Sequence, residues 1–237
     1  MINAQIIDKI RQIVRFYETS KISGANYGAI ALLHDGPDNH VQITYGSTQT
    51  TEYGNLRVLL GNYANANGRY SEQMRPWINR IGDHSQPSLA TNTIFIQLLK
   101  DASTDVVMHL IQDKFFVEHY FSPAQNWFTP AGLTLPLSLL VIYDSYVQSG
   151  SMMDWLVAKV SEKLPKLGGQ EKTWITQYAT ARGNWLRTSV NHPALHATEY
   201  RTDSFLNAIA KDNWALDQPY MVGRYNLEFF QLQATIA

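Results

Sequence analysis

Residues 17–46 read YETSKISGANYGAIALLHDGPDNHVQITYG, and this stretch decides the expected fold. Before it, apolar residues recur at spacings of three and four from Ile2 to Tyr17, which is typical of an amphipathic helix. Gly24 ends this region. We therefore expect Glu18 in the last turn of the first helix or just past it.

A β-hairpin is predicted directly after this helix. Residues 27–33 and 41–45 are apolar runs with Ile, Val, Thr and Tyr, and the segment 34–40 between them (HDGPDNH) is dense in turn-forming residues. Helical patterns follow for most of the chain, whereas the stretch after Leu216 is expected to be irregular or extended. The predicted helices cover residues 52–66, 70–81, 90–112, 115–128, 130–149, 151–163, 171–188 and 198–211.

Composition excludes several classes of protein. The chain has 237 residues, 45% of them hydrophobic, which suits one domain with a packed core. With 19 basic and 20 acidic residues, the near-neutral charge does not indicate nucleic-acid binding, and no segment is apolar enough to span a membrane. There are no cysteines, and no tight cluster of His and Asp predicts a metal. We expect no cofactor.

Carboxylates in opposed environments point to glycosidic-bond hydrolysis. Glu18 follows Phe16 and Tyr17 at a helix C-terminus, where apolar neighbours and the helix dipole favour a protonated carboxyl group. Asp35 and Asp38 lie in the polar hairpin tip, where they should stay ionised. This pattern predicts Glu18 as general acid and Asp35 or Asp38 as general base.

The order of these elements resembles the lysozyme superfamily, in which a hydroxyl group on the return strand helps to hold the attacking water. Thr44 is the candidate for this role, with Ser47 and Thr48 as alternatives. The resemblance is closest to the family 46 chitosanases and extends over about 200 residues. The segments that carry it are Tyr17-Glu18, residues 55–63 (NLRVLLGNY), residues 142–150 (IYDSYVQSG), Ala181-Arg182, residues 199–205 and Trp214-Ala215-Leu216.

This resemblance implies a mostly α (α+β), lysozyme-like fold with a small N-terminal sheet beside a cleft. Residues 1–237 would form one domain of two lobes, with the cleft between the 1–60 region and the helical remainder. The spacing to Glu18 favours Asp35 as the base, whereas the spacing to Thr44 favours Asp38; Asp35 is preferred slightly.

The resemblance also implies further site residues. Asp144 and Arg182 match the ionic pair that lies behind the acid in family 46. The second arginine of the family aligns with Ala197, while Arg201 is nearby but out of register. The residues expected to contact substrate are Glu52, Asn55, Tyr45 and Ser47.

Substrate specificity is predicted from missing carboxylates. The family acid that binds a glucosamine ammonium group aligns with Asn55, and two further acidic positions align with Ser189 and Pro193. Because each lost charge-assisted hydrogen bond costs roughly 1.5–3 kcal/mol, a neutral N-acetylated polymer is favoured over polycationic chitosan.

The expected function is therefore inverting, endo-acting hydrolysis of β-1,4 bonds in bacterial peptidoglycan, as in a phage lysin or an exported antibacterial toxin domain. The alternatives are a true chitosanase and a non-catalytic glycan-binding protein. The expected partners are the polysaccharide substrate and an immunity or delivery protein. We expect it to act outside the cytoplasm on a cell wall, exported by another route or with its signal removed, because no signal peptide is visible.

Overall fold

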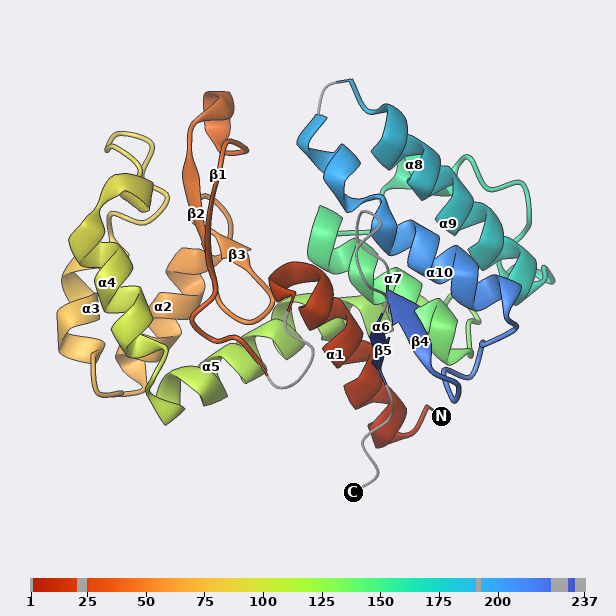
Figure 1. Ribbon diagram of the computed structural model, residues 1–237, viewed down its shortest axis with the longest axis horizontal. Coiled ribbons are helices and arrows are strands. Elements are labelled where there is room, and N and C mark those ends of the chain that lie inside the picture. The colour runs from red at the N-terminus through yellow and green to blue at the C-terminus, as the bar shows by residue number, and fades with distance from the viewer. Residues whose placement is uncertain (1, 21–24, 191–192, 223–229, 233–237) are drawn as a thin grey trace. The chain divides into compact units, whose positions relative to one another are not determined.

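Helix α1 (Ala4–Thr19) forms where the amphipathic pattern predicts it. Ile10, Ile13 and Val14 are fully buried. The helix ends at Thr19, and Ser20 follows with a positive φ of 55°, the left-handed conformation that commonly terminates helices. Glu18 therefore lies in the last turn. The structure, a computed structural model, describes residues 2–20, 25–190, 193–222 and 230–232 (Figure 1).

Contacts within the chain divide it into two compact units. We call Met1–Tyr17 with Tyr120–Ala237 the helical unit and Glu18–His119 the hairpin unit. The predicted boundary near residue 60 coincides with neither division. The reason is that the helices between residue 60 and His119 belong to the hairpin unit: helix α5 (Val106–Phe116) packs on α2 (Leu56–Asn65), and the turn Leu89–Thr91 contacts strand β2 (Gln42–Tyr45).

In the helical unit, helix α7 forms the centre of the core. It begins with Pro136 in its first turn, where proline is well tolerated, and ends at Gly150 with a positive φ of 75°. Helices α9 and α10 pack against it and against each other (Figure 1). The elements of this unit are α1 (Ala4–Thr19), α6 (Ser122–Phe128), α7 (Pro136–Ser149), α8 (Asp154–Val157), α9 (Glu171–Thr188), α10 (Tyr200–Ala210), β4 (Tyr220–Val222) and β5 (Phe230–Leu232).

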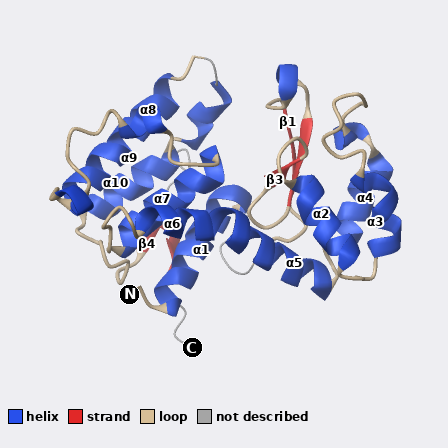
Figure 2. Cartoon of the chain, turned by 180° about the vertical axis from the view of Figure 1, so that it is seen from behind, coloured by secondary structure: helices blue, strands red, loops and turns tan. Residues whose placement is uncertain are grey.

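In the hairpin unit, the predicted hairpin forms with one added strand. Strands β1 and β2 pair antiparallel from Ile30 opposite Tyr45 to Leu33 opposite Gln42. Strand β3 pairs with β2 and was not predicted (Figure 2). The elements of this unit are β1 (Ile30–Leu33), β2 (Gln42–Tyr45), β3 (Thr50–Thr51), α2 (Leu56–Asn65), α3 (Ser71–Ile78), α4 (Thr93–Ala102) and α5 (Val106–Phe116).

The mostly helical fold with a small antiparallel sheet confirms the predicted class. Several predicted helices differ from the structure: 115–128, for example, includes the π-helical turn Val117–Phe121, and 130–149 is helical only from Pro136. The segment 90–112 contains two helices, because Asp105 caps the start of α5 by accepting a hydrogen bond from the Val107 amide (3.0 Å). The segment 151–163 is helical only over α8.

Candidate active site

The carbonyl oxygen of Tyr17, one residue before the half-buried Glu18, is held by two side chains. It accepts hydrogen bonds from the Tyr200 hydroxyl (2.9 Å) and from Nη2 of Arg201 (3.4 Å). Carbonyl groups in the last turn of a helix have no partner within the helix, so side-chain donors satisfy one here. These contacts restrain the peptide unit that carries Glu18.

Arg201 connects this carbonyl to a buried charge network. Its Nη1 lies 3.0 Å from Oδ1 of Asp144, and Nη1 of Arg182 lies 2.7 Å from Oδ2 of the same carboxylate. The side chains of Asp144 and Arg182 are 0% exposed, and that of Arg201 is 6% exposed. The contact with Arg182 is an ion pair by distance but lacks the angle of a directed hydrogen bond. Arg182 also donates a hydrogen bond to Oε1 of Gln148.

The ring of Tyr17 is enclosed by the same elements. It packs edge-on against Tyr200 with 5.7 Å between centroids, and the guanidinium of Arg201 lies 5.4 Å from its centroid. The Tyr17 hydroxyl is 2.8 Å from the hydroxyl of Tyr220. Burial, followed by the nearby Tyr220 and Asp144, raises the pKa of Tyr17 well above its usual value, so this phenol stays neutral.

The structure brings Asp144 and Arg182 together, as the sequence suggested. It also brings in Arg201, which lies out of register with the family's second arginine, and Tyr200, which is not among the predicted site residues. Counting residues without a gap failed because the connection between α9 and α10 can change in length while both helices keep their packing. The signal that could have found Arg201 is its position in the first turn of α10, next to Tyr200.

On the hairpin, Asp35 and Asp38 are both exposed. Oδ1 of Asp35 accepts a hydrogen bond from Nε2 of Gln42 (2.8 Å), and Gln42 is itself buried in strand β2. Asp38 lies in the short helical turn Pro37–Asn39 with a left-handed φ of 52°. Asp35 is therefore the carboxylate whose orientation the hairpin fixes.

Thr44 lies in strand β2 opposite Ala31 and Thr51, and its side chain is buried. Its hydroxyl donates toward Oε1 of Gln49 and lies 3.4 Å from the Ala31 carbonyl oxygen. A hydroxyl group that donates one hydrogen bond keeps lone pairs that can accept one from water. Its predicted role in holding water stays a prediction. Ser47 and Thr48, the alternatives, are also buried.

Three of the four residues predicted to contact substrate are buried. Glu52 is 2% exposed and accepts hydrogen bonds from the Ser88 hydroxyl (2.6 Å) and the Leu89 amide (2.8 Å). Tyr45 and Ser47 are 0% exposed. Because these three side chains are buried, we correct the prediction that they contact substrate. Only Asn55, which is partly exposed at the start of α2, stays a predicted substrate contact.

Metal ligands and membrane-spanning helices can be assessed for the described part of the chain. Within it, no three His, Asp or Glu side chains are grouped as a metal site would require. None of its helices is both long enough and apolar enough to cross a lipid bilayer.

A family match shows that this chain is a glycoside hydrolase. A match to glycosyl hydrolase family 46 spans residues 12–220, and the chain belongs to this family, whose fold is lysozyme-like. The chitosanase of Bacillus subtilis (strain 168) is 27% identical over 150 residues, which is 58% of this chain and 53% of that protein. The aligned region thus spans about half of that relative.

Solved structures agree in fold. The family 46 chitosanase of Gynuella sunshinyii, in complex with chitotetraose, superposes with a TM-score of 0.84 at 23% identity and covers 98% of this chain and 99% of that one. The native chitosanase of Bacillus subtilis MY002 gives a TM-score of 0.84 at 21% identity, covering 98% and 100%.

These findings overturn the prediction of a peptidoglycan-cleaving enzyme. The family match and the chitosanase relative support the alternative that the sequence analysis ranked second. The prediction failed because it treated three aligned positions as the whole of the recognition chemistry. Asp35 and Asp38 remain exposed, so acidic groups that can meet an ammonium ion persist on the hairpin unit.

Proposed function

We propose that this glycoside hydrolase cleaves β-1,4 bonds of chitosan by an inverting mechanism. The observation that carries this proposal is the family 46 match over residues 12–220, a span that includes Glu18, Asp35, Asp144 and Arg201. The chitosanase relative supports the same substrate. Glucosamine units bear ammonium groups, which pair favourably with carboxylates such as those of Asp35 and Asp38.

Glu18 is the general acid in this proposal and protonates the oxygen of the leaving sugar. Asp35 is the general base that takes a proton from the attacking water, and Thr44 accepts a hydrogen bond from that water. In an inverting enzyme the water attacks the face of the sugar opposite the leaving group. We prefer Asp35 to Asp38 because Gln42 fixes the Asp35 carboxylate.

The buried network acts as the support of the acid. Asp144 orients Arg201, which together with Tyr200 holds the carbonyl group of Tyr17. A rigid supporting shell keeps a catalytic group close to its productive geometry. Asp144, Arg182, Arg201 and Tyr200 are therefore positioning residues.

We infer that the enzyme acts outside the cytoplasm. A polysaccharide of this kind does not cross membranes, so the enzyme must be present in the compartment that contains the polymer. The predicted immunity or delivery protein stays a prediction.

Reducing-end assays on soluble chitosan, with purified sacculi as the comparison substrate, test the proposal. Glu18→Gln and Asp35→Asn should each lower kcat on chitosan by at least about 100-fold, as expected for loss of a general acid or base. Asp38→Asn is the matched control and should retain most activity. NMR of the first product should show the α-anomer. Equal loss in Asp35→Asn and Asp38→Asn would reject Asp35 as the base, and unchanged turnover by Glu18→Gln would reject the mechanism.

A further inference from the structure

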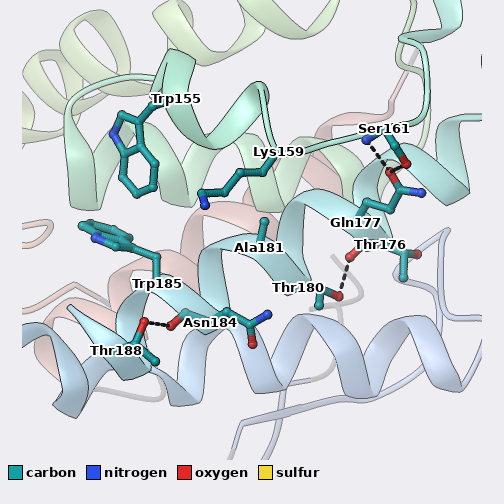
Figure 3. Close-up of a pocket in the computed structure, with 10 residues that line it drawn as sticks. All are labelled: Trp155, Lys159, Ser161, Thr176, Gln177, Thr180, Ala181, Asn184, Trp185 and Thr188. Atoms are coloured by element: carbon teal, nitrogen blue, oxygen red, sulfur yellow. Dashed lines mark hydrogen bonds between the residues drawn. The ribbon is translucent and has the colours of Figure 1, made fainter.

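A groove lies in the helical unit between helix α9 and the segment that runs from α8 to Ser161 (Figure 3). Its volume is about 630 Å³, within the range of sites that bind small molecules. Figure 3 shows the rings of Trp155 and Trp185 at one end and Ser161 with Gln177 at the other. Lys159 extends between them.

The groove is separate from the buried charge network although both use helix α9. Tyr178 and Arg182 point into the core, and Arg182 meets Asp144 there. Thr180 and Asn184 lie on the exposed side of the same helix and line the groove. None of the residues to which we assign catalysis lines it.

The tryptophan pair offers an apolar platform. The two rings meet edge to face with 5.4 Å between centroids, and Trp155 remains 45% exposed. Each ring holds the other in place, so little side-chain freedom is lost when a ligand packs on them. Flat, weakly polar C–H faces such as those of pyranose rings suit an aromatic surface of this kind.

The polar wall is already ordered. Oε1 of Gln177 accepts hydrogen bonds from the Ser161 amide (2.9 Å) and hydroxyl (3.1 Å), which orients its amide group. The hydroxyls of Thr180 and Thr188 donate to carbonyl oxygens one turn earlier, at 2.8 Å each. Their lone pairs can still accept hydrogen bonds, and the exposed amide of Asn184 can both donate and accept. This mixture of groups suits sugar hydroxyls and acetamido groups.

Charge decides between two kinds of amino sugar. Among the described residues that line the groove, Lys159 is the one with a charged side chain, and none has a carboxylate. An ammonium group of glucosamine would meet a like charge here, whereas an N-acetylated unit is neutral.

We propose that this groove binds N-acetylglucosamine units of a partly acetylated β-1,4 chain, apart from the catalytic residues. The site would hold the acetylated stretches of a polymer whose free-amine stretches are cleaved elsewhere on the protein. This goes beyond the proposed function, and binding here does not require that Glu18 be the acid.

Site-resolved NMR on the full-length Glu18→Gln protein tests the proposal, because this variant measures binding without turnover. On titration with a β-1,4-linked N-acetylglucosamine tetramer, the indole N–H signals of Trp155 and Trp185 should shift. Trp185→Ala should weaken the tetramer's affinity for this site by about ten-fold. The matched control is Trp77→Ala in helix α3, a half-buried tryptophan of the hairpin unit, which should leave the titration of Trp155 unchanged.

The charge argument has its own test. A glucosamine tetramer should shift the same indole signals only at a several-fold higher concentration than the acetylated tetramer does. In Lys159→Met the concentrations that the two tetramers require should become more similar. Indole signals of Trp155 and Trp185 that stay unshifted at millimolar acetylated tetramer would overturn the proposal. Equal response to both tetramers in the protein that retains Lys159 would overturn the assigned ligand.

Discussion

Tyr17 is buried against Tyr200, and its carbonyl oxygen accepts a hydrogen bond from the Tyr200 hydroxyl (2.9 Å). At the scale of single residues, this hydroxyl is the contact that can be removed with least disturbance, because a phenylalanine keeps the ring packing. What would be lost is one donor to the carbonyl group that precedes Glu18.

We expect Tyr200→Phe to lower kcat on chitosan by about five-fold, which corresponds to about 1 kcal/mol for one hydrogen bond. KM should change little, because the hydroxyl acts through Glu18 and not on the substrate. Initial rates over a range of chitosan concentrations separate the two constants.

Tyr178→Phe is the matched control. Its hydroxyl is also buried but bonds Ser145 (3.1 Å) and does not contact Tyr17. Tyr178→Phe should lower the free energy of unfolding by about as much as Tyr200→Phe does, and it should leave kcat unchanged. Equal loss of kcat in both variants would mean that the effect is general loosening of the core.

At the residue scale, the helical pattern predicted Glu18 at the end of α1, where the structure has it. The pairing of Asp144 with Arg182 came from the family resemblance, and the structure shows these side chains in contact. Burial could not be predicted for Glu52, because its carboxylate is enclosed by a turn 36 residues later in the chain. Local patterns carry no information on such partners.

At the scale of elements, Asp105 joins three parts of the hairpin unit. It caps α5 through the Val107 amide, and its Oδ2 accepts hydrogen bonds from the Tyr63 hydroxyl (2.8 Å) and the Arg69 amide (2.6 Å). Burial alone would raise the pKa of Asp105, but these hydrogen bonds together lower it below its usual value.

Asp105→Ala should therefore reduce the free energy of unfolding by about 1–2 kcal/mol at neutral pH, the usual size of a lost helix cap. Because the pKa is depressed in the folded state, the stabilisation is complete above the unfolded value and is lost as the pH falls through the folded value. Urea titrations at pH 7 and at pH 3 should show the difference from the parent protein shrinking at the lower pH.

Asp101→Ala serves as the control for this cap. Its carboxylate accepts a hydrogen bond from Gln97 on the exposed face of α4 and spans no elements. It should change stability little at either pH. If Asp105→Ala lowers the free energy of unfolding by the same amount at pH 7 and at pH 3, the ionised Asp105 carboxylate is not the cause of the stabilisation.

The boundaries of elements were less predictable than their types. The apolar pattern of residues 90–112 continues through the break at residues 103–105, so periodicity alone did not reveal two helices. Strand β3 has only two residues, too few for an alternating pattern to show. Caps and short pairings are decided by contacts that the sequence pattern does not contain.

At the scale of the whole molecule, each unit has a core of its own. Arg182→Met should lower the stability of the helical unit by about 3–5 kcal/mol, the usual result when one member of a buried ion pair is removed. Hydrogen exchange should accelerate in peptides from α7, α9 and α10 and much less in those from α2 to α5.

Arg187→Met is the control on the same helix. This arginine pairs with Glu199 and Asp203 at the surface and is 38% exposed, so its loss should cost less than about 1 kcal/mol. If hydrogen exchange in Arg182→Met accelerates equally in peptides from both units, the two units unfold together.

The support of the proposed acid also ties activity to the folding of segments far along the chain. Tyr17 is held by residues 183 to 203 positions later, and Lys9 on α1 donates to the carbonyl oxygens of Leu216 (2.7 Å) and Gln218 (2.8 Å). While the ribosome is still adding α10 and β4, the first helix has no lasting partner there. Under the proposed function, hydrolytic competence thus requires that residues 200–220 have already emerged and folded.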